Sequence, residues 1–220
     1  MPARGRISGV LIAALAALAA VGVPAAELEV AVVGVDGKPV ASAVVMLRSN
    51  VAAAAPRAAA AAATVDQMNK QFAPWVQVLR VGTPVRFANH DDITHHVYSF
   101  SPAKRFAYRL QTGEVQGPLD FDAPGVVVLG CNIHDWMVGY LYVTDAPRAL
   151  VTDADGRARF GALAAGAWQV QVWHPGLTAA AAPPDRSVML AADDRLSISL
   201  KLGAALRETG PRRPLAGSDY

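Results

Sequence analysis

Short apolar runs, interrupted every few residues by Gly, Pro or Asp, dominate the chain after residue 26. Several runs alternate apolar with polar residues, and the clearest cases are residues 168–172 and 196–202. Alternation with a period of two is typical of strands that have one solvated face. No stretch shows the 3.6-residue period of an amphipathic helix. The pattern therefore predicts an all-β protein.

The expected strands follow from β-branched and aromatic runs bounded by turn residues. We expect residues 27–35 and 40–47 to form a hairpin, with Asp36-Gly37 as its turn. The other expected strands are residues 75–81, 85–88, 97–100, 125–130, 138–143, 168–172 and 196–202. Together they are sufficient for more than one β-sandwich.

The first residues have the order of a secretory signal peptide. Arg4 and Arg6 precede an apolar stretch over 7–23, and small residues follow before Glu27, so we assign 1–26 as the signal. Retention of this stretch as an anchor is the alternative, because it is barely long enough to cross a bilayer. No later segment is a membrane candidate, so we expect a periplasmic or secreted protein with no membrane span after cleavage.

Charge and cysteine content exclude several classes of function. The whole chain carries a formal charge of +2, and loss of Arg4 and Arg6 with the signal leaves a neutral protein. A neutral chain lacks the basic face that phosphate binding needs, which argues against nucleic acid as a partner. The single cysteine, Cys131, excludes an internal disulfide and any four-thiolate metal site. A lone thiol in an oxidising compartment is expected to be buried or bound.

Two segments of low complexity indicate the domain organisation. Residues 51–63 are mostly alanine but contain Pro56, and we predict a linker there. Residues 204–220 contain Pro, Gly and Arg without periodicity, and we predict a flexible tail. The remaining strands then fall into a central unit, 64–144, and two flanking segments, 27–50 and 145–203.

The chemistry-bearing residues gather within 89–97 and 131–137. Cys131, His134 and Met137 supply a thiolate, an imidazole and a thioether at regular spacing, and a tight loop between two strands can turn all three toward one point. With one more imidazole from upstream, this is the donor set of a trigonal copper site with a weak axial Met.

The upstream imidazole belongs to either His95 or His96. Because successive side chains of a strand point to opposite faces, only one of the two can reach the metal. Alternation by itself leaves both candidates open.

The pattern Cys131-x2-His134-x2-Met137 with an upstream His resembles the cupredoxins, the small blue-copper proteins, and its short loop is similar to that of amicyanin. The resemblance covers about 64–144 and extends to periplasmic cupredoxin-domain proteins labelled methylamine utilization proteins. It implies a Greek-key β-sandwich with one type 1 copper ion. Cupredoxins usually have Asn and an apolar residue after the upstream ligand, which favours His95 and leaves His96 as the alternative.

The flanking segments have a resemblance of their own. Residues 36–45, 152–156 and 166–172 resemble parts of a carboxypeptidase-regulatory-like, transthyretin-type β-sandwich. The implied arrangement is a discontinuous second sandwich, 27–50 with 145–203, into which the cupredoxin unit is inserted or against which it packs.

Several neighbours of the ligands are candidates for supporting roles. Polar residues can orient an imidazole, although loop acids are usually only solvated; these candidates are Asn89, Asp91, Asp92, Asn132 and Asp135. In cupredoxins the apolar surface around the loop His is where a partner docks, and this implies docking or simple packing for Ile133 and Trp136. We expect His90 and His174 to be surface or turn residues.

The function predicted from these residues is one-electron transfer by a non-enzymatic copper protein, with electrons passing an exposed edge of His134. The partner would be another redox protein, such as a cytochrome or a dehydrogenase. One alternative is a non-redox copper-handling or structural β-sandwich protein. A second is a Cys–His enzyme with Cys131 as nucleophile and His134 or His95 as base, although no oxyanion donors are recognisable. Five histidines are too few for a multicopper oxidase.

Overall fold

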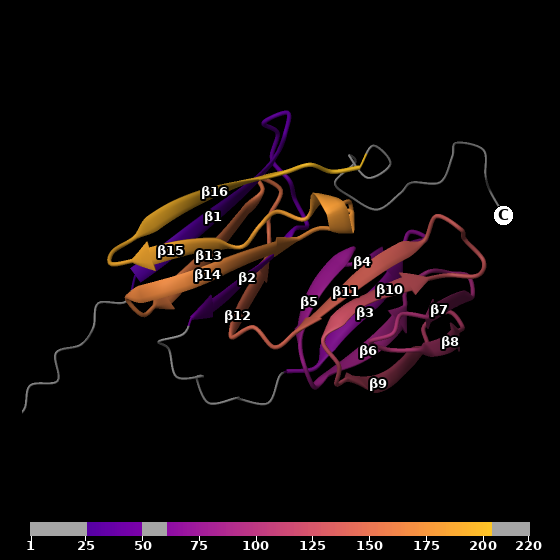
Figure 1. The fold of residues 1–220 in the computed structure, drawn as a ribbon. Helices are drawn as coiled ribbons and strands as arrows, with labels where there is room; N and C mark the ends of the chain where they lie inside the picture. The colour runs from indigo at the N-terminus through magenta and orange to yellow at the C-terminus, as the bar shows by residue number, and fades with distance from the viewer. Residues whose placement is uncertain (1–25, 50–60, 204–220) are drawn as a thin grey trace, which may run out of the picture.

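The computed structural model describes residues 26–49 and 61–203, which form strands joined by turns and one short 3-10 turn at Ala179–Ala181 (Figure 1). The described residues contain no α-helix, and the all-β prediction is confirmed. No helix within them is long and apolar enough to cross a membrane. The predicted signal, apart from Ala26, most of the linker and the tail lie outside the described residues.

Nine consecutive strands, β3 to β11, form the middle sandwich. One sheet has the order β5-β11-β10-β7-β8 and the other has the order β4-β3-β6-β9. The strands are β3 (Ala63–Met68), β4 (Gln71–Ala73), β5 (Val76–Arg80), β6 (Thr83–Asn89), β7 (His95–Ser99), β8 (Phe106–Leu110), β9 (Val115–Phe121), β10 (Gly125–Gly130) and β11 (Val138–Thr144).

The core of the middle sandwich fills the space between these two sheets. Val65 and Phe87 point inward from one sheet, and Leu129 and Leu141 point inward from the other. Cys131 and Met137 belong to the same buried cluster, at the end of the sandwich where β10 ends and β11 begins. Burial of this apolar surface is the main force that holds the two sheets together.

The remaining strands form the flanking sandwich, although they lie on both sides of the middle sandwich in the sequence. Its sheets have the orders β13-β1-β16 and β12-β2-β14-β15. The strands are β1 (Ala26–Gly34), β2 (Val44–Ser49), β12 (Arg148–Val151), β13 (Arg157–Leu163), β14 (Gly166–Trp173), β15 (Arg186–Leu190) and β16 (Asp194–Leu200). The chain thus leaves this sandwich after β2 and returns to it at β12.

The hairpin expected over residues 27–47 is wrong. β1 pairs with β13 and β16, whereas β2 pairs with β12 and β14 in the other sheet. Only a tight turn remains of the expected hairpin: Val33 and Pro39 form an isolated bridge, and the N–H groups of Gly34 and Val40 donate to the carbonyls of Lys38 and Val32. Ser42 then takes a positive φ of 60°, after which β2 crosses to the opposite sheet. The crossing lets Val30 of β1 and Val45 of β2 bury their side chains in one shared core.

A third apolar cluster joins the two sandwiches, which lie side by side (Figure 1). Val44 and Met46 of β2 pack with Trp75 and Val76 at the start of β5. Trp173 of β14 lies 5.1 Å from Tyr142 and 6.0 Å from Tyr140, measured between ring centroids. The two sandwiches therefore share an apolar interface with several aromatic rings.

Candidate metal centre

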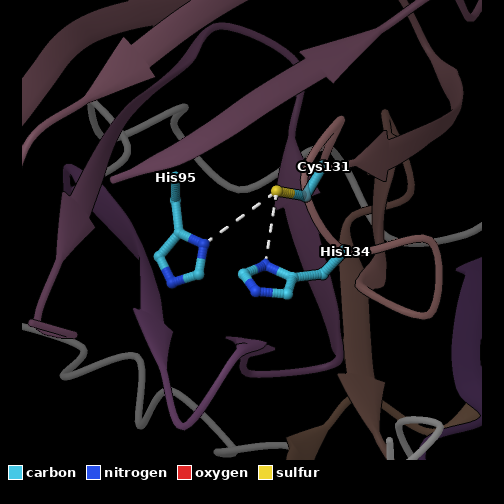
Figure 2. Close-up of side chains that lie close together, drawn as sticks. All are labelled: His95, Cys131 and His134. Atoms are coloured by element: carbon cyan, nitrogen blue, oxygen red, sulfur yellow. Dashed lines mark hydrogen bonds between the residues drawn. The ribbon is translucent and has the colours of Figure 1, made fainter. Parts of the chain in front are cut away.

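His95, Cys131 and His134 come together at one end of the middle sandwich (Figure 2). One potential ligand atom from each of them lies within 4.8 Å of the other two, and all three side chains are buried. Within the described part of the chain, no other group of three His, Cys, Asp or Glu residues has this arrangement. Ligands from a strand and a distant loop therefore converge as a preformed cluster.

The secondary structure explains why these side chains meet. Cys131 directly follows β10, and Met137 directly precedes β11. β10 and β11 are antiparallel neighbours that pair up to Gly130 and Val138, so both ends of the seven-residue loop are fixed. Inside the loop the Met137 N–H donates to the His134 carbonyl over 3.0 Å and closes a tight turn.

The distances in the cluster fit a metal ion. The Nδ1 atoms of His95 and His134 each lie 3.9 Å from the Cys131 Sγ. Bonds of about 2.0 Å to nitrogen and about 2.3 Å to sulfur around a trigonal or tetrahedral ion separate these atoms by about 3.5–3.7 Å. Small side-chain adjustments would complete coordination. A thiolate with two imidazoles is a donor set that suits copper or zinc.

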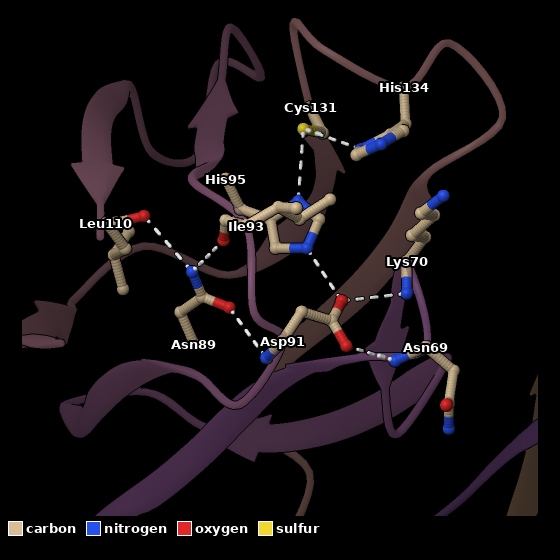
Figure 3. Close-up of polar contacts among 9 residues, drawn as sticks. All are labelled: Asn69, Lys70, Asn89, Asp91, Ile93, His95, Leu110, Cys131 and His134. Carbon is tan, nitrogen blue, oxygen red and sulfur yellow. Dashed lines mark hydrogen bonds and ion pairs between the residues drawn. The ribbon is translucent and has the colours of Figure 1, made fainter. Parts of the chain in front are cut away.

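Asp91 orients the His95 ring from the side opposite the thiol (Figure 3). Its Oδ2 lies 2.7 Å from His95 Nε2, which leaves Nδ1 of the same ring facing Cys131. The Asp91 carboxylate also accepts the backbone N–H groups of Asn69, at 2.6 Å, and Lys70, at 2.8 Å. The turn between β3 and β4 therefore fixes the position of the Asp91 carboxylate, and the carboxylate fixes the orientation of the His95 ring.

The Asp91 carboxylate and the His95 imidazole each favour the charged form of the other. Burial opposes ionisation of Asp91, but the backbone donors Lys70 and Asn69 and the His95 ring outweigh it and lower the pKa of this carboxyl. Burial likewise opposes protonation of His95, but Cys131 and Asp91 raise the pKa of the imidazole. His95 is thus a well-oriented ring between two acidic groups.

The Cys131 thiol is prepared to lose its proton. Burial alone would raise its pKa, but the His95 ring and the backbone N–H groups of His96, Ile133 and His134 lower it. The thiolate, not the thiol, is the form that binds a metal. For His134, burial and the positive charges of His95 and Lys70 lower the pKa, which favours the neutral imidazole that a metal requires.

The expected exposed edge of His134 is wrong. The side chain is only 1% exposed, and its Nε2 is buried without a hydrogen-bond partner among the described residues. The Trp136 ring covers it, with 5.0 Å between the two ring centroids. Ile133, at 42% exposed, is the apolar residue of the loop that reaches solvent.

The other residues predicted for the site take different places. Met137 is 1% exposed in the same buried cluster as Cys131. His96 points to the other face of β7, where its Nδ1 lies 3.2 Å from Asn132 Nδ2, so this pair ties the Cys131 loop to the strand. Asp135 is exposed on the loop.

Asn89 supports the loop that carries Asp91. Its Oδ1 accepts the Asp91 N–H at 3.0 Å, and its Nδ2 donates to the carbonyls of Ile93 and Leu110 (Figure 3). Asp92 is exposed and does not share this role.

The two remaining histidines lie outside the cluster. His90 is exposed, as expected, and contacts Asp66 over 3.1 Å. His174 begins a turn, which is one of its two expected places, because its carbonyl accepts the Leu177 N–H over 2.9 Å. It is not at the surface: the side chain is fully buried, 5.9 Å from Trp75 between ring centroids. A role for the turn at Asn69 and Lys70 was not predicted from the sequence. This turn is distant from the ligands in the sequence, and only the tertiary structure brings it to Asp91.

Comparisons with known proteins return copper proteins among solved structures. A Cu-containing nitrite reductase from Thermus scotoductus is 28% identical over 44% of this chain, with a TM-score of 0.37, and the match spans only a quarter (25%) of the reductase. A purple cupredoxin from Nitrosopumilus maritimus is 25% identical over 37% of this chain and 99% of its own length, with a TM-score of 0.33.

A Cu(I) form of an amicyanin mutant is 20% identical over 46% of this chain and 98% of its own length, with a TM-score of 0.35. No family model and no curated protein matches the chain. Each of these three copper proteins is aligned with less than half of this chain.

Proposed function

We propose that this chain is a periplasmic one-electron carrier that holds a single type 1 copper ion through His95, Cys131 and His134, with Met137 as a weak axial donor. The observation that carries the proposal is the buried convergence of a thiol and two imidazole nitrogens within 4.8 Å. Bound copper would supply the one-electron chemistry, and a mixed thiolate and imidazole set accommodates both of its common oxidation states.

The protein's own contribution is to keep the ligands in place while the charge changes. Asp91 holds the His95 ring, and the β10–β11 pair holds both ends of the Cys131 loop. Ligands that are already constrained need little rearrangement on oxidation or reduction. Rigid positioning of this kind favours a carrier over a site that must open to exchange substrate.

Electron access would pass through the side chains that cover His134. Trp136 packs on the His134 ring, and the neighbouring Ile133 is 42% exposed. A redox protein that docks on Ile133 and Trp136 would stand one side-chain layer from a ligand. We propose a cytochrome or a dehydrogenase-like protein as this partner.

Reconstitution with copper tests this function directly. Copper-free protein titrated with Cu(II) should develop an intense thiolate-to-copper charge-transfer band at one equivalent, and the band should bleach and return reversibly in a redox titration. Binding without reversible bleaching would instead favour a copper-handling protein. Absence of any such band in folded protein would refute the proposal.

The axial donor has its own test. Met137→Gln should keep the charge-transfer band, because the thiolate remains, while the reduction potential shifts, because axial ligands tune type 1 sites. An unchanged potential would show that Met137 only fills the core. Met46→Gln is not a suitable comparison, since Met46 contributes to the interface between the sandwiches; Met68→Gln, at an exposed position, is the control.

A further inference from the structure

One buried side chain of the middle sandwich has no hydrogen-bond partner, in the described part of the chain, for either of its polar atoms. Gln67 is 0% exposed, yet neither its Oε1 nor its Nε2 has a hydrogen-bond partner among the described residues. A buried polar group that is left unpaired destabilises the folded protein. The neighbouring amide of Asn89 is, in contrast, fully engaged at both ends. An unpaired amide in a native core requires an explanation.

The register of β3 places Gln67 at the end of the sandwich where the loop that carries Asp91 begins. Gln67 is buried on the same face of β3 as Val65, which belongs to the core between the two sheets. β3 runs parallel to β6, and Gln67 lies opposite Asn89, the last residue of β6 before the loop that carries Asp91. The Gln67 carbonyl also accepts the N–H of His90 from that loop, at 2.9 Å.

The opposite wall at this level belongs to β11. Phe72 is the partner of Gln67 on β4, and its ring packs so closely on Gly139 that a Cβ there would lie 2.9 Å from the Phe72 Cβ. Gly139 is buried two residues after Met137. Gln67 therefore occupies the inner layer of the sandwich that also contains Asn89 and Met137.

We propose that the side chain of Gln67 faces the metal site formed by His95, Cys131 and His134. Its carboxamide oxygen would turn toward the bound copper ion and stabilise Cu(II) relative to Cu(I). No hydrogen bond fixes the orientation of this amide, so its dipole is free to follow the local field. Cu(II) with one thiolate carries a net positive charge, whereas Cu(I) with one thiolate is neutral. The oxygen end of the dipole therefore favours Cu(II), and low dielectric in the core strengthens the effect.

The role of Gln67 rests on the proposed function, because it concerns the same ion. Gln67 would change the reduction potential of the copper ion without being a ligand, so the thiolate-to-copper charge-transfer band does not depend on it. In the copper-free protein the Gln67 amide lowers the stability of the fold, because it has no hydrogen-bond partner among the described residues. Replacement with an apolar residue should thus stabilise the copper-free protein and weaken Cu(II) binding, two effects of opposite sign.

The test uses Gln67→Leu with Gln77→Leu as the matched control. Gln77 also has a buried, unpaired side-chain oxygen, but it lies on β5 opposite Leu141, further along β11 from the site. Affinities for Cu(II) and Cu(I) are measured by competition with chelators, the potential by redox titration, and the copper-free stability by chemical denaturation. Should Gln67→Leu fold poorly, Gln67→Ala removes the same amide at the expense of a cavity.

We expect about a tenfold weaker affinity for Cu(II) in Gln67→Leu, the lower end of the effect of outer groups on metal sites, with Cu(I) affinity little changed. A tenfold difference between the two states corresponds to a positive shift of about 59 mV for a one-electron couple. Gln77→Leu should leave both affinities and the potential as in the wild type.

Two outcomes overturn the role of Gln67 and leave the proposed function intact: an unchanged ratio of Cu(II) to Cu(I) affinity in the variant, or an equal change in the Gln77→Leu control. Failure of the wild-type protein to bind copper at all would instead overturn the proposed function, and with it the tuning role. A less stable copper-free Gln67→Leu protein would show that the amide has partners in solution, which also contradicts the proposal.

Discussion

The middle and flanking sandwiches have similar apolar cores but differ in the polar groups that they bury. In the flanking sandwich, Thr152 is buried with its hydroxyl fully engaged, donating to Val40 and accepting from Ala43. In the middle sandwich, His95, His134 and Gln67 are buried with nitrogen or oxygen atoms aimed at no partner or at a sulfur. Thr152 is thus satisfied within the fold, whereas several buried polar atoms of the middle sandwich have no partner among the described residues; in the flanking sandwich His174 Nε2 is the corresponding case.

The difference teaches where to look for function in a chain with two sandwiches of the same class. Buried, mutually coupled titratable groups concentrate at functional sites because stability alone does not favour them. His174 is the exception in the flanking sandwich, and its Nδ1 accepts the Gly176 N–H over 3.0 Å, as expected of a residue that shapes a turn. The following predictions test this contrast, from the largest expected effect to the smallest.

Cys131→Ser should abolish the charge-transfer band and lower copper affinity by more than about 100-fold, since the thiolate is the strongest donor of the set. Absorption and competition titrations measure both. The copper-free variant should keep its stability to within about 1 kcal/mol, because a serine hydroxyl occupies nearly the same space. A charge-transfer band that persists in Cys131→Ser would show that the Cys131 thiolate is not its source and would contradict the proposed ligand set.

The flanking sandwich should lose stability in acid through His174. Burial lowers the pKa of its imidazole to about 4 from 6.5, so the unfolded chain binds the proton first as the pH falls. The contribution is complete above pH 6.5 and is lost as the pH falls toward 4, by about 3 kcal/mol. Denaturation of copper-free protein at several pH values measures the slope.

His174→Asn is the matched variant for that slope, because its Oδ1 can accept the Gly176 N–H in place of Nδ1. Subtracting the variant's pH profile from the wild-type profile isolates His174 from His95 and Asp91, which titrate in the other sandwich. Parallel profiles would show that His174 is not the acid-sensitive group.

Asp91→Asn should weaken copper binding by about tenfold, because it removes the charge that orients His95 and the acceptor for the Lys70 N–H. Competition titrations measure the change. Asp92→Asn, one residue away and exposed, is the control and should bind as the wild type does. Equal loss in both variants would mean that only the loop's net charge matters.

Trp136→Leu should have the smallest effect, a few-fold faster exchange of electrons with a small inorganic oxidant, because it uncovers the His134 edge. Stopped-flow bleaching of the charge-transfer band measures the rate. The band itself should not move, since Trp136 is not a ligand. A slower reaction would contradict this prediction and show that electrons reach even a small oxidant through the Trp136 ring.

Much of the fold was predictable from local pattern, and the misses have physical causes. Gly125–Gly130 is a strand with the expected bounds, because its β-branched run has no competing interpretation. β9 (Val115–Phe121) was missed because Gly117-Pro118 argues against a strand. It is an edge strand in the order β4-β3-β6-β9, and edge strands tolerate proline.

The sequence by itself determined the kinds of donor available, since one thiol, one thioether and a few imidazoles are countable and their spacing suits a loop between strands. Only the tertiary structure decided that His134 is covered, that Asp91 is clamped by the turn at Asn69 and Lys70, and that Gln67 has no partner. The donor atoms that a residue offers to a metal depend only on its residue type, so they can be predicted from the sequence. Burial and partnership depend on strand register between segments far apart in the chain, and packing of the whole core sets that register.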